Sequence, residues 1–178
     1  DHARLGSDEY WCAEDCAPLL RHRLGRDIRV KPLRYGVKAP LGDCWISFHP
    51  AGHIRGSAQV RIEQGSTVWV VTGDYKRDPD PTCEPFEPVP CQTLITEATF
   101  GLPIYHWASS ETTIGAVMEW WEWCKQERVT ALLFCYALGK AQRILAELCR
   151  WTDEEVLMHG AIAALTNIYR EQGVAMVP

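Results

Sequence analysis

Residues 78–90 carry five prolines, and this segment constrains the fold of the chain more than any other feature. Proline lacks a backbone N–H and fixes φ, so a segment this rich in proline forms neither a helix nor an interior strand. We therefore predict a connecting loop. The residues on its two sides follow different hydrophobic periodicities, which indicates two differently built halves.

The half before the loop is rich in strand-forming residues. It predicts a helix over 15–24 and strands over 28–35, 44–48, 58–63 and 67–72, with a hairpin turn at 64–66. After the loop, the pattern predicts a strand over 93–96, helices over 111–128, 140–151 and 161–172, and strands over 130–135 and 156–158. Alternating helices and strands indicate a parallel layer, so we expect an α/β protein with a domain boundary near residues 103–107.

The composition excludes several classes of protein. The chain has 178 residues, of which 47% are hydrophobic and 23% charged, with a net charge of −5. These values are typical of a soluble globular protein and exclude disorder, collagen and coiled coil. The apolar runs are far shorter than the ~20 residues of a membrane helix, so we expect no membrane partner. Eight cysteines without a CxxC pair favour buried free thiols in a reducing cytoplasm.

Two segments place metal-competent side chains directly after apolar strands. His53 lies between two glycines, which let the backbone pass close to an ion, and Asp74 directly follows a glycine at the end of another strand. Each residue alone is more often structural, as a hydrogen-bonded histidine or a turn aspartate. Together with Asp1, His2 and Glu97 they provide the imidazoles and carboxylates that suit a hydrolytic zinc pair.

The order of these residues resembles the metallo-β-lactamase superfamily. Residues 1–4 are similar to the second half of its HxHxDH signature. Residues 52–57 resemble its third motif, in which His53 would be a ligand, and residues 72–76 resemble its fourth motif, in which Asp74 would bridge two metals.

Later segments resemble the β-CASP branch of this superfamily, which processes nucleic acids. Residues 96–101 are similar to the acidic motif that opens the β-CASP insertion, and residues 134–143 to its strand-to-helix turn. Three further runs most closely resemble the bacterial ligase-associated DNA exonucleases: 49–60, 101–105 and 158–161. Members of that family are about twice as long, so the resemblance implies that this chain is the middle part of a longer protein.

The resemblance implies a fold and a set of site residues. The fold would be part of a metallo-β-lactamase αβ/βα sandwich over residues 1–104, followed by the start of a β-CASP α/β domain over 105–178. The implied metal ligands within this sequence are Asp1, His2, His53 and Asp74. The resemblance implies two Zn²⁺ ions in the complete protein, whose other histidine ligands lie outside this sequence, with Mn²⁺ as the alternative metal. The implied catalytic residues are Asp74, Asp1 and Glu97, where Glu97 orients a histidine or the attacking water.

The resemblance also implies an activity. A zinc-dependent DNA exonuclease of this kind hydrolyses phosphodiester bonds with a metal-activated hydroxide, acts in DNA repair, and works beside a DNA ligase and a helicase. Two alternatives remain open at this point. One is an RNA-processing nuclease of the same branch, and the other is a catalytically silent DNA-binding module.

Three further features suggest contacts with a nucleic acid. Lys140 and Arg143 follow a glycine at a strand-to-helix turn and would bind substrate phosphate, although a plain turn needs no ligand. The basic residues within 21–38 would steer a polyanion or form a solvated face. Trp120, Trp121 and Trp123 lie on one helix, where packing in a core or at an interface is favoured over base stacking.

Overall fold

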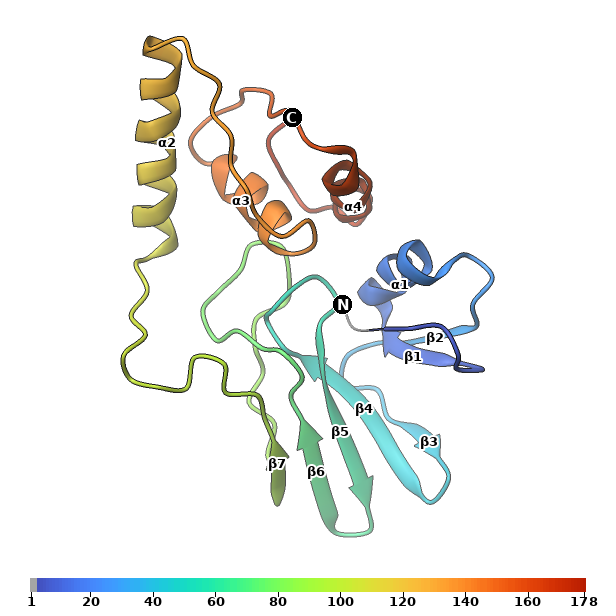
Figure 1. Cartoon of the computed structure of the whole chain (residues 1–178). Coiled ribbons are helices and arrows are strands. Elements are labelled where there is room, and N and C mark those ends of the chain that lie inside the picture. Colours follow the sequence, from blue (N-terminus) through green and yellow to red (C-terminus); the bar gives the residue numbers. More distant parts are fainter. Residues whose placement is uncertain (1–2) are drawn as a thin grey trace. The chain divides into compact units, whose positions relative to one another are not determined.

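The computed structural model describes residues 3–178, so Asp1 and His2 lie outside the described residues. Helices and β-sheets occur together in the chain, which confirms the α/β class. The chain divides into two compact units, Asp1–Glu97 and Ala98–Pro178 (Figure 1). The sandwich, the β-CASP domain and a boundary between residues 104 and 105 stay predictions.

The first unit contains a five-stranded sheet with the strand order β3-β4-β5-β6-β7. Its strands are β3 (Ala39–Leu41), β4 (Cys44–Pro50), β5 (Ala58–Gln64), β6 (Thr67–Val71) and β7 (Thr93–Ile95). The predicted strands 44–48, 58–63, 67–72 and 93–96 are therefore confirmed, with small shifts at their ends. Gly65, with φ of +59°, lies in the turn of the β5–β6 hairpin.

Strand direction brings three strand ends to one edge of this sheet. Strand β4 is antiparallel to β5, and β5 is antiparallel to β6, so β4 and β6 run the same way. Their arrows point in the same direction in Figure 1. Strand β7 pairs parallel to β6, with Val71 opposite Ile95. The loops that follow β4, β6 and β7 consequently begin at the same edge.

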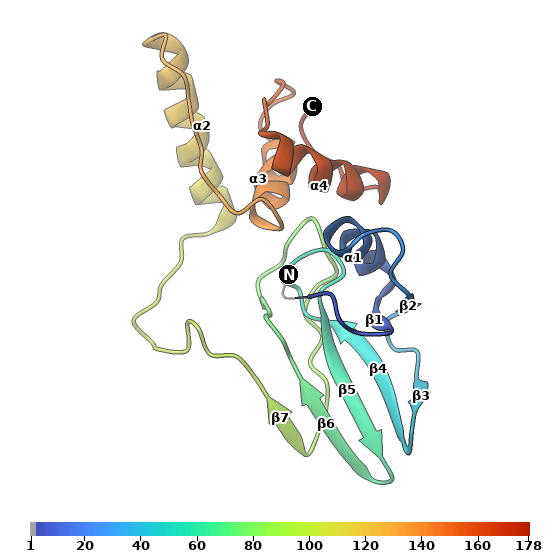
Figure 2. The same cartoon turned by 45° about the vertical axis from the view of Figure 1, so that its right-hand side comes forward.

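A parallel pair of short strands, β1 (Tyr10–Ala13) and β2 (Val30–Leu33), precedes the sheet. The 3-10 turn η1 (Glu14–Cys16) and helix α1 (Ala17–Leu24) connect the two strands (Figure 2). The helix predicted over 15–24 is thus an α-helix only from its third residue. Strand β1 is missing from the sequence-based expectations because its four residues show no apolar alternation.

The proline-rich segment is a loop, as expected, and Glu87 from this loop contacts polar side chains of the sheet. Glu87 Oε1 lies 3.1 Å from His49 Nδ1, and His49 Nε2 lies 3.1 Å from Ser47 Oγ. Gln59 is 1% exposed and donates from Nε2 to the carbonyls of Pro50 at 2.9 Å and Glu87 at 2.6 Å. These bonds satisfy the buried side chains of Ser47 and Gln59 and join the proline-rich loop to the sheet.

The described part of the second unit contains three helices, at the places where the sequence predicts them. They are α2 (Ser110–Gln126), α3 (Lys140–Leu148) and α4 (Gly160–Glu171). The core of this unit is formed by Ile114 of α2, Leu145 and Leu148 of α3, and Val177. None of the helices within residues 3–178 combines the length and the apolar character that crossing a bilayer requires.

The prediction of two strands in this unit is wrong. Residues 130–135 and 156–158 belong to neither sheet, so the described residues 98–178 contain no parallel layer. A strand requires a neighbour for its backbone hydrogen bonds, and the bonds here are isolated, such as that from Val156 N to the Pro178 carbonyl at 3.0 Å. Side chains that a sheet would cover are therefore exposed, with Phe134 at 89% and Leu157 at 90%.

Candidate functional site

Three residues predicted for the site leave the sheet at the same edge. His53 lies in the loop after β4, Asp74 follows β6, and Glu97 follows β7. The sequence order alone does not place them there, because their arrangement depends on β4, β6 and β7 running in one direction. The edge where several strands end is a common place for binding and catalytic residues.

The side chains of His53 and Asp74 face each other. His53 Nε2 lies 3.9 Å from Asp74 Oδ2, which is too long for a hydrogen bond and close enough for an ion pair when the imidazole is protonated. Both side chains are accessible, with 43% and 58% of their surfaces exposed. Glu97 is half-buried and has an interaction partner within the chain. An exposed imidazole and an exposed carboxylate at this separation form two donors that can share one metal ion.

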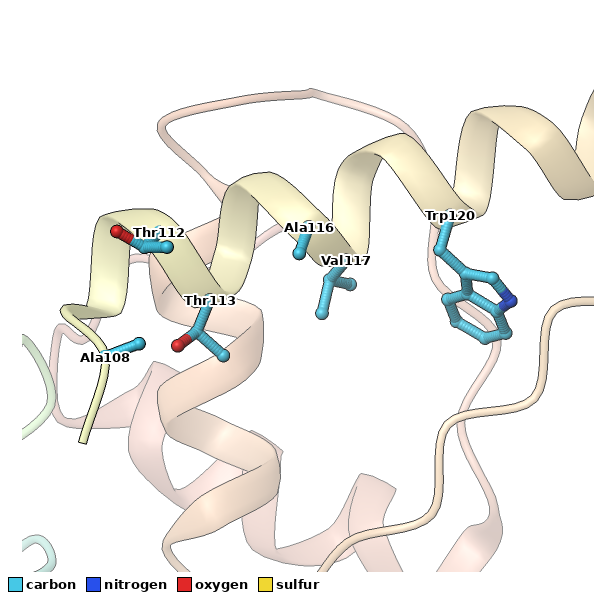
Figure 3. Close-up of a pocket in the computed structure, with 6 residues that line it drawn as sticks. All are labelled: Ala108, Thr112, Thr113, Ala116, Val117 and Trp120. Carbon is cyan, nitrogen blue, oxygen red and sulfur yellow. The ribbon is translucent and has the colours of Figure 1, made fainter. Parts of the chain in front are cut away.

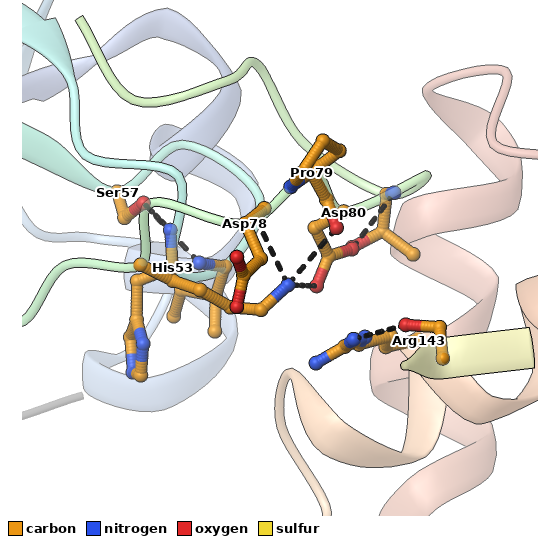
Figure 4. A network of polar contacts seen from close by, with 10 residues as sticks. His53, Ser57, Asp78, Pro79, Asp80 and Arg143 are labelled. Atoms are coloured by element: carbon orange, nitrogen blue, oxygen red, sulfur yellow. Dashed lines mark hydrogen bonds and ion pairs between the residues drawn. The ribbon is translucent and has the colours of Figure 1, made fainter. Parts of the chain in front are cut away.

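Backbone hydrogen bonds to Ser57 fix the conformation of the His53 loop. The Ser57 hydroxyl accepts the N–H of His53 at 3.1 Å and the N–H of Ile54 at 3.2 Å (Figure 4). The Ser57 N–H in turn donates to the Ile54 carbonyl at 2.9 Å. The Tyr35 hydroxyl donates to the Ser57 carbonyl at 2.9 Å, and burial raises the pKa of Tyr35, so this donor stays protonated.

Gly52 and Gly56 let other backbone segments approach the His53 loop. Both have left-handed backbone angles, with φ of +69° and +71°. A Cβ at Gly52 would lie 2.3 Å from the Lys76 carbonyl oxygen, and a Cβ at Gly56 would lie 2.3 Å from the Cys16 amide nitrogen. Only glycine fits such contacts, so the loop is held between two distant parts of the first unit.

An ion pair reinforces the contact between this loop and the turn before α1. Arg55 Nη2 lies 3.0 Å from Asp15 Oδ2, and the two side chains are 18% and 32% exposed. Partial burial reduces solvent screening of this pair. The loop therefore has a polar support, Arg55 on Asp15, beside the close backbone contact at Gly56.

The segment that carries Asp74 is held through Thr72 and Lys76. Thr72 is 3% exposed, and its hydroxyl donates to the Gly73 carbonyl at 2.8 Å. The Lys76 N–H donates to the Ala51 carbonyl at 3.0 Å, which joins this segment to the His53 loop. Lys76 Nζ donates to the carbonyls of residues 78 and 79 at 3.1 and 3.0 Å and lies 3.7 Å from Asp80 Oδ2 (Figure 4). Lys76 thus fixes the proline-rich loop.

Of the four predicted metal ligands, the structure describes two, His53 and Asp74, and places them close together. Asp1 and His2 lie outside the described residues, so their placement stays a prediction. Within residues 3–178, no group of three or more His, Cys, Asp or Glu side chains is placed to hold a metal ion. Metal binding by His53 and Asp74 therefore stays a prediction.

Lys140 and Arg143 belong to the second unit, at the start of α3. Gly139 precedes the helix with φ of +83°, and its N–H donates to Gln142 Oε1 at 2.7 Å. Arg143 Nη2 donates to Ser110 Oγ at 2.6 Å, and Lys140 Nζ lies 5.5 Å from the centre of the Tyr136 ring. Arg143 thus joins α3 to the first residue of α2. Phosphate binding by Lys140 and Arg143 stays a prediction.

The basic residues within 21–38 are partly neutralised. Three of them form ion pairs: Arg29 with Glu9 at 3.9 Å, Arg34 with Glu14 at 3.3 Å, and Lys38 with Glu63. Lys31 Nζ lies 3.6 Å from the centre of the Trp11 ring. The positive charge available to a polyanion is therefore smaller than the sequence suggests.

The tryptophans of α2 do not form a core within the described residues. Trp120 and Trp123 are 36% and 53% exposed, and Lys125 Nζ lies 4.9 Å from the Trp121 ring centre. One side of the helix, including Trp120, lines an open apolar groove of about 460 Å³ (Figure 3). The other lining residues are Ala108, Thr112, Thr113, Ala116 and Val117. Packing at an interface remains a prediction for these tryptophans.

Sequence reasoning missed the residues that support the site. Ser57 carries a local signal, because serine close behind a glycine-bounded loop often accepts backbone N–H groups. Tyr35 and Asp15 carry no such signal, since they reach the His53 loop from distant positions in the sequence.

The chain is similar to a known protein but matches no known family. No family model matches the chain. A protein of Opitutus terrae named a probable DNA ligase is 32% identical over 173 residues, an alignment that covers 96% of this chain. The chain spans 17% of the length of that relative, so it is similar to one segment of a much longer protein.

Proposed function

We propose that the chain is part of a zinc-dependent DNA exonuclease that resembles the ligase-associated members of the β-CASP branch. The observation that carries this proposal is the approach of His53 Nε2 to within 3.9 Å of Asp74 Oδ2 at an accessible sheet edge. These are the residues on which the resemblance depends. The name of the relative, a probable DNA ligase, supports a role in DNA metabolism and DNA as the substrate.

His53 and Asp74 would hold the metal, with Asp1 and His2 as further ligands. Zinc, when bound, lowers the pKa of water and stabilises the negative charge that develops on phosphate oxygens. Asp74 suits a position between two ions because a carboxylate has two oxygen donors. Glu97 follows the neighbouring parallel strand, where it would orient a ligand or accept a proton from the attacking water.

The rigid support of the loop fits this role. A metal site requires donors that stay in place before the ion arrives, because ordering them on binding reduces affinity. Ser57 holds the backbone next to His53, and Thr72 holds the backbone next to Asp74. Neither residue needs to touch the metal to influence its affinity.

A hydrolysis assay on the full-length protein that contains this chain tests the proposal. We expect zinc-dependent release of nucleotides from a DNA oligonucleotide, and loss of that activity in Asp74→Asn and His53→Ala with the fold retained. The matched controls are Asp27→Asn and His22→Ala, which change exposed residues of the α1 region. Full activity of Asp74→Asn would overturn the assignment of Asp74.

The same assay separates the proposal from its alternatives. Faster cleavage of an RNA oligonucleotide of matched sequence would instead indicate an RNA-processing nuclease. A protein that binds DNA with a steep salt dependence but neither holds zinc nor cuts would be a silent DNA-binding module.

A further inference from the structure

Three aromatic side chains form an exposed cluster at the start of the second unit. They come from residues 100–107, part of the irregular segment between β7 and α2 (Figure 1). The rings of Phe100, Tyr105 and Trp107 contact one another, and 58%, 42% and 69% of these residues are exposed. The core of the unit lies elsewhere, around Ile114 of α2. The cluster therefore presents aromatic ring faces to solvent.

Contacts among the three rings fix their relative orientation. The Phe100 ring forms T-shaped contacts with Tyr105 and Trp107, at centroid distances of 5.2 and 5.1 Å and interplanar angles of 75° and 81°. The rings of Tyr105 and Trp107 are nearly parallel, with an angle of 7° and centroids 6.3 Å apart. T-shaped contacts are favoured by the ring quadrupoles, so Phe100 supports two parallel rings.

Two turns hold the backbone that carries these rings. The Gly101 N–H donates to the Ala98 carbonyl at 3.0 Å, and the Tyr105 N–H donates to the Leu102 carbonyl at 3.3 Å. A surface that is arranged before binding loses less conformational entropy when a ligand arrives. The turns and the ring contacts together make the cluster suitable as a binding surface.

The composition of the segment favours a flat aromatic group as the ligand. Residues 98–110 contain no Lys, Arg, Asp or Glu, so the cluster does not recognise a ligand through salt bridges, and no carboxylate there repels phosphate groups. Two parallel rings match successive bases of a nucleic-acid strand, because stacked bases also lie parallel to one another. Bases inside a duplex already stack on their neighbours, so their faces are accessible only in a single strand.

We propose that Tyr105 and Trp107 bind bases of single-stranded DNA by stacking, with Phe100 as the support of both rings. The choice of DNA rests on the proposed function. In the sequence, the cluster begins three residues after Glu97, the residue which that function assigns to the attacking water. The substrate strand would be held by its bases and without strong sequence preference, because every base has a ring face.

Strand binding by the full-length protein tests this proposal, in EDTA so that no cleavage occurs. The probes are a fluorescein-labelled oligothymidylate and an abasic strand of the same length, which has the phosphates without the bases. Fluorescence polarisation gives both affinities at one salt concentration. Trp107→Leu and Tyr105→Leu should each weaken oligothymidylate binding at least about fivefold and leave binding of the abasic strand unchanged.

Two control variants separate stacking from a general loss of apolar surface. Trp107→Phe keeps an aromatic ring and should bind oligothymidylate within about twofold of the unmodified protein. Ile104→Ala shortens an aliphatic side chain of the same segment, which is 71% exposed, and should leave both affinities unchanged.

Oligothymidylate binding that Trp107→Leu does not weaken, or equal affinities of the unmodified protein for the two strands, would overturn the proposal. Equal weakening by Ile104→Ala and Trp107→Leu would also overturn it and would indicate an apolar protein interface. These results are independent of cleavage. Zinc-dependent cleavage with unchanged binding by Trp107→Leu would exclude only the stacking site, whereas base-dependent binding without cleavage would exclude only the nuclease.

Discussion

Individual residues at the sheet edge determine whether His53 can stay in place. The loop depends on glycine where another backbone comes close, as at Gly56, and on a hydroxyl acceptor, as at Ser57. Any side chain at position 56 would clash with the neighbouring backbone, and a side chain without an acceptor at position 57 would leave two backbone N–H groups unbonded. Substitutions at these positions should therefore have large effects, although neither side chain is a candidate metal ligand.

Gly56→Ala should strongly destabilise the first unit. Its left-handed backbone, with φ of +71°, disfavours alanine by about 1–2 kcal/mol. The added Cβ would also lie 2.3 Å from the Cys16 nitrogen, so one of the two backbones must move. Gly65→Ala is the matched control, because Gly65 has φ of +59° and open space around it. Urea unfolding measures both, and equal losses would contradict the close contact.

Ser57→Ala should cost about 1–3 kcal/mol of unfolding free energy, because it leaves the N–H groups of His53 and Ile54 without their acceptor. Ser66→Ala, in the exposed hairpin turn, should change stability by less than about 0.5 kcal/mol. Urea unfolding again provides the measurement. A Ser57→Ala variant as stable as Ser66→Ala would show that the Ser57 hydroxyl does not hold the loop.

At the scale of secondary-structure elements, local sequence patterns predict the strands whose pairing partners are close in the sequence. Strands β4, β5 and β6 are predicted well because their apolar patterns and the turn at Gly65 are local signals. The segment 130–135 has the same apolar character, yet no neighbouring strand pairs with it, and its residues stay outside the sheets. The proximity of His53 and Asp74 was predicted only through the family resemblance, since the strand directions that bring them together are not a local property.

Hydrogen exchange tests the unpaired state of residues 130–135. Their amides should exchange at least about 100-fold faster than those of residues 59–62 in β5, which lies between two strands. Mass spectrometry of peptides from exchanged protein gives both rates. Comparable protection of the two segments would mean that residues 130–135 pair with a strand after all.

The antiparallel strands also carry a pH-sensitive contact. Glu63 of β5 accepts hydrogen bonds from Lys38 and Arg61, which lower its pKa from 4.5 to about 2. A carboxylate whose pKa is lower in the folded state stabilises the fold above its unfolded pKa. This contribution should thus be present above about pH 4.5 and disappear as the pH falls toward 2.

Comparison of Glu63→Gln with the unmodified protein measures this contribution. The variant should be less stable at pH 7, and the difference should shrink between pH 4.5 and pH 2. Glu155→Gln, at an exposed position, should show no such dependence. A difference for Glu63→Gln that is constant across this range would contradict the lowered pKa.

At the scale of the whole molecule, the described candidate ligands lie in one unit and the predicted phosphate contacts in the other. His53 and Asp74 belong to Asp1–Glu97, and Lys140 and Arg143 belong to Ala98–Pro178. The proposed substrate is DNA, whose approach the chain's net charge of −5 opposes, and several basic residues are already paired with acids. A cation at the sheet edge would therefore contribute to attracting the substrate as well as to the chemistry.

Zinc binding by the full-length protein, measured by calorimetry after bound metal has been removed, tests the proposed metal site most directly. We predict tight binding that weakens at least about 100-fold in His53→Ala and in Asp74→Asn, and remains unchanged in His22→Ala and Asp27→Asn. Tight zinc binding that survives both substitutions, or no zinc binding by the unmodified protein, would contradict the central claim that this sheet edge is a metal site.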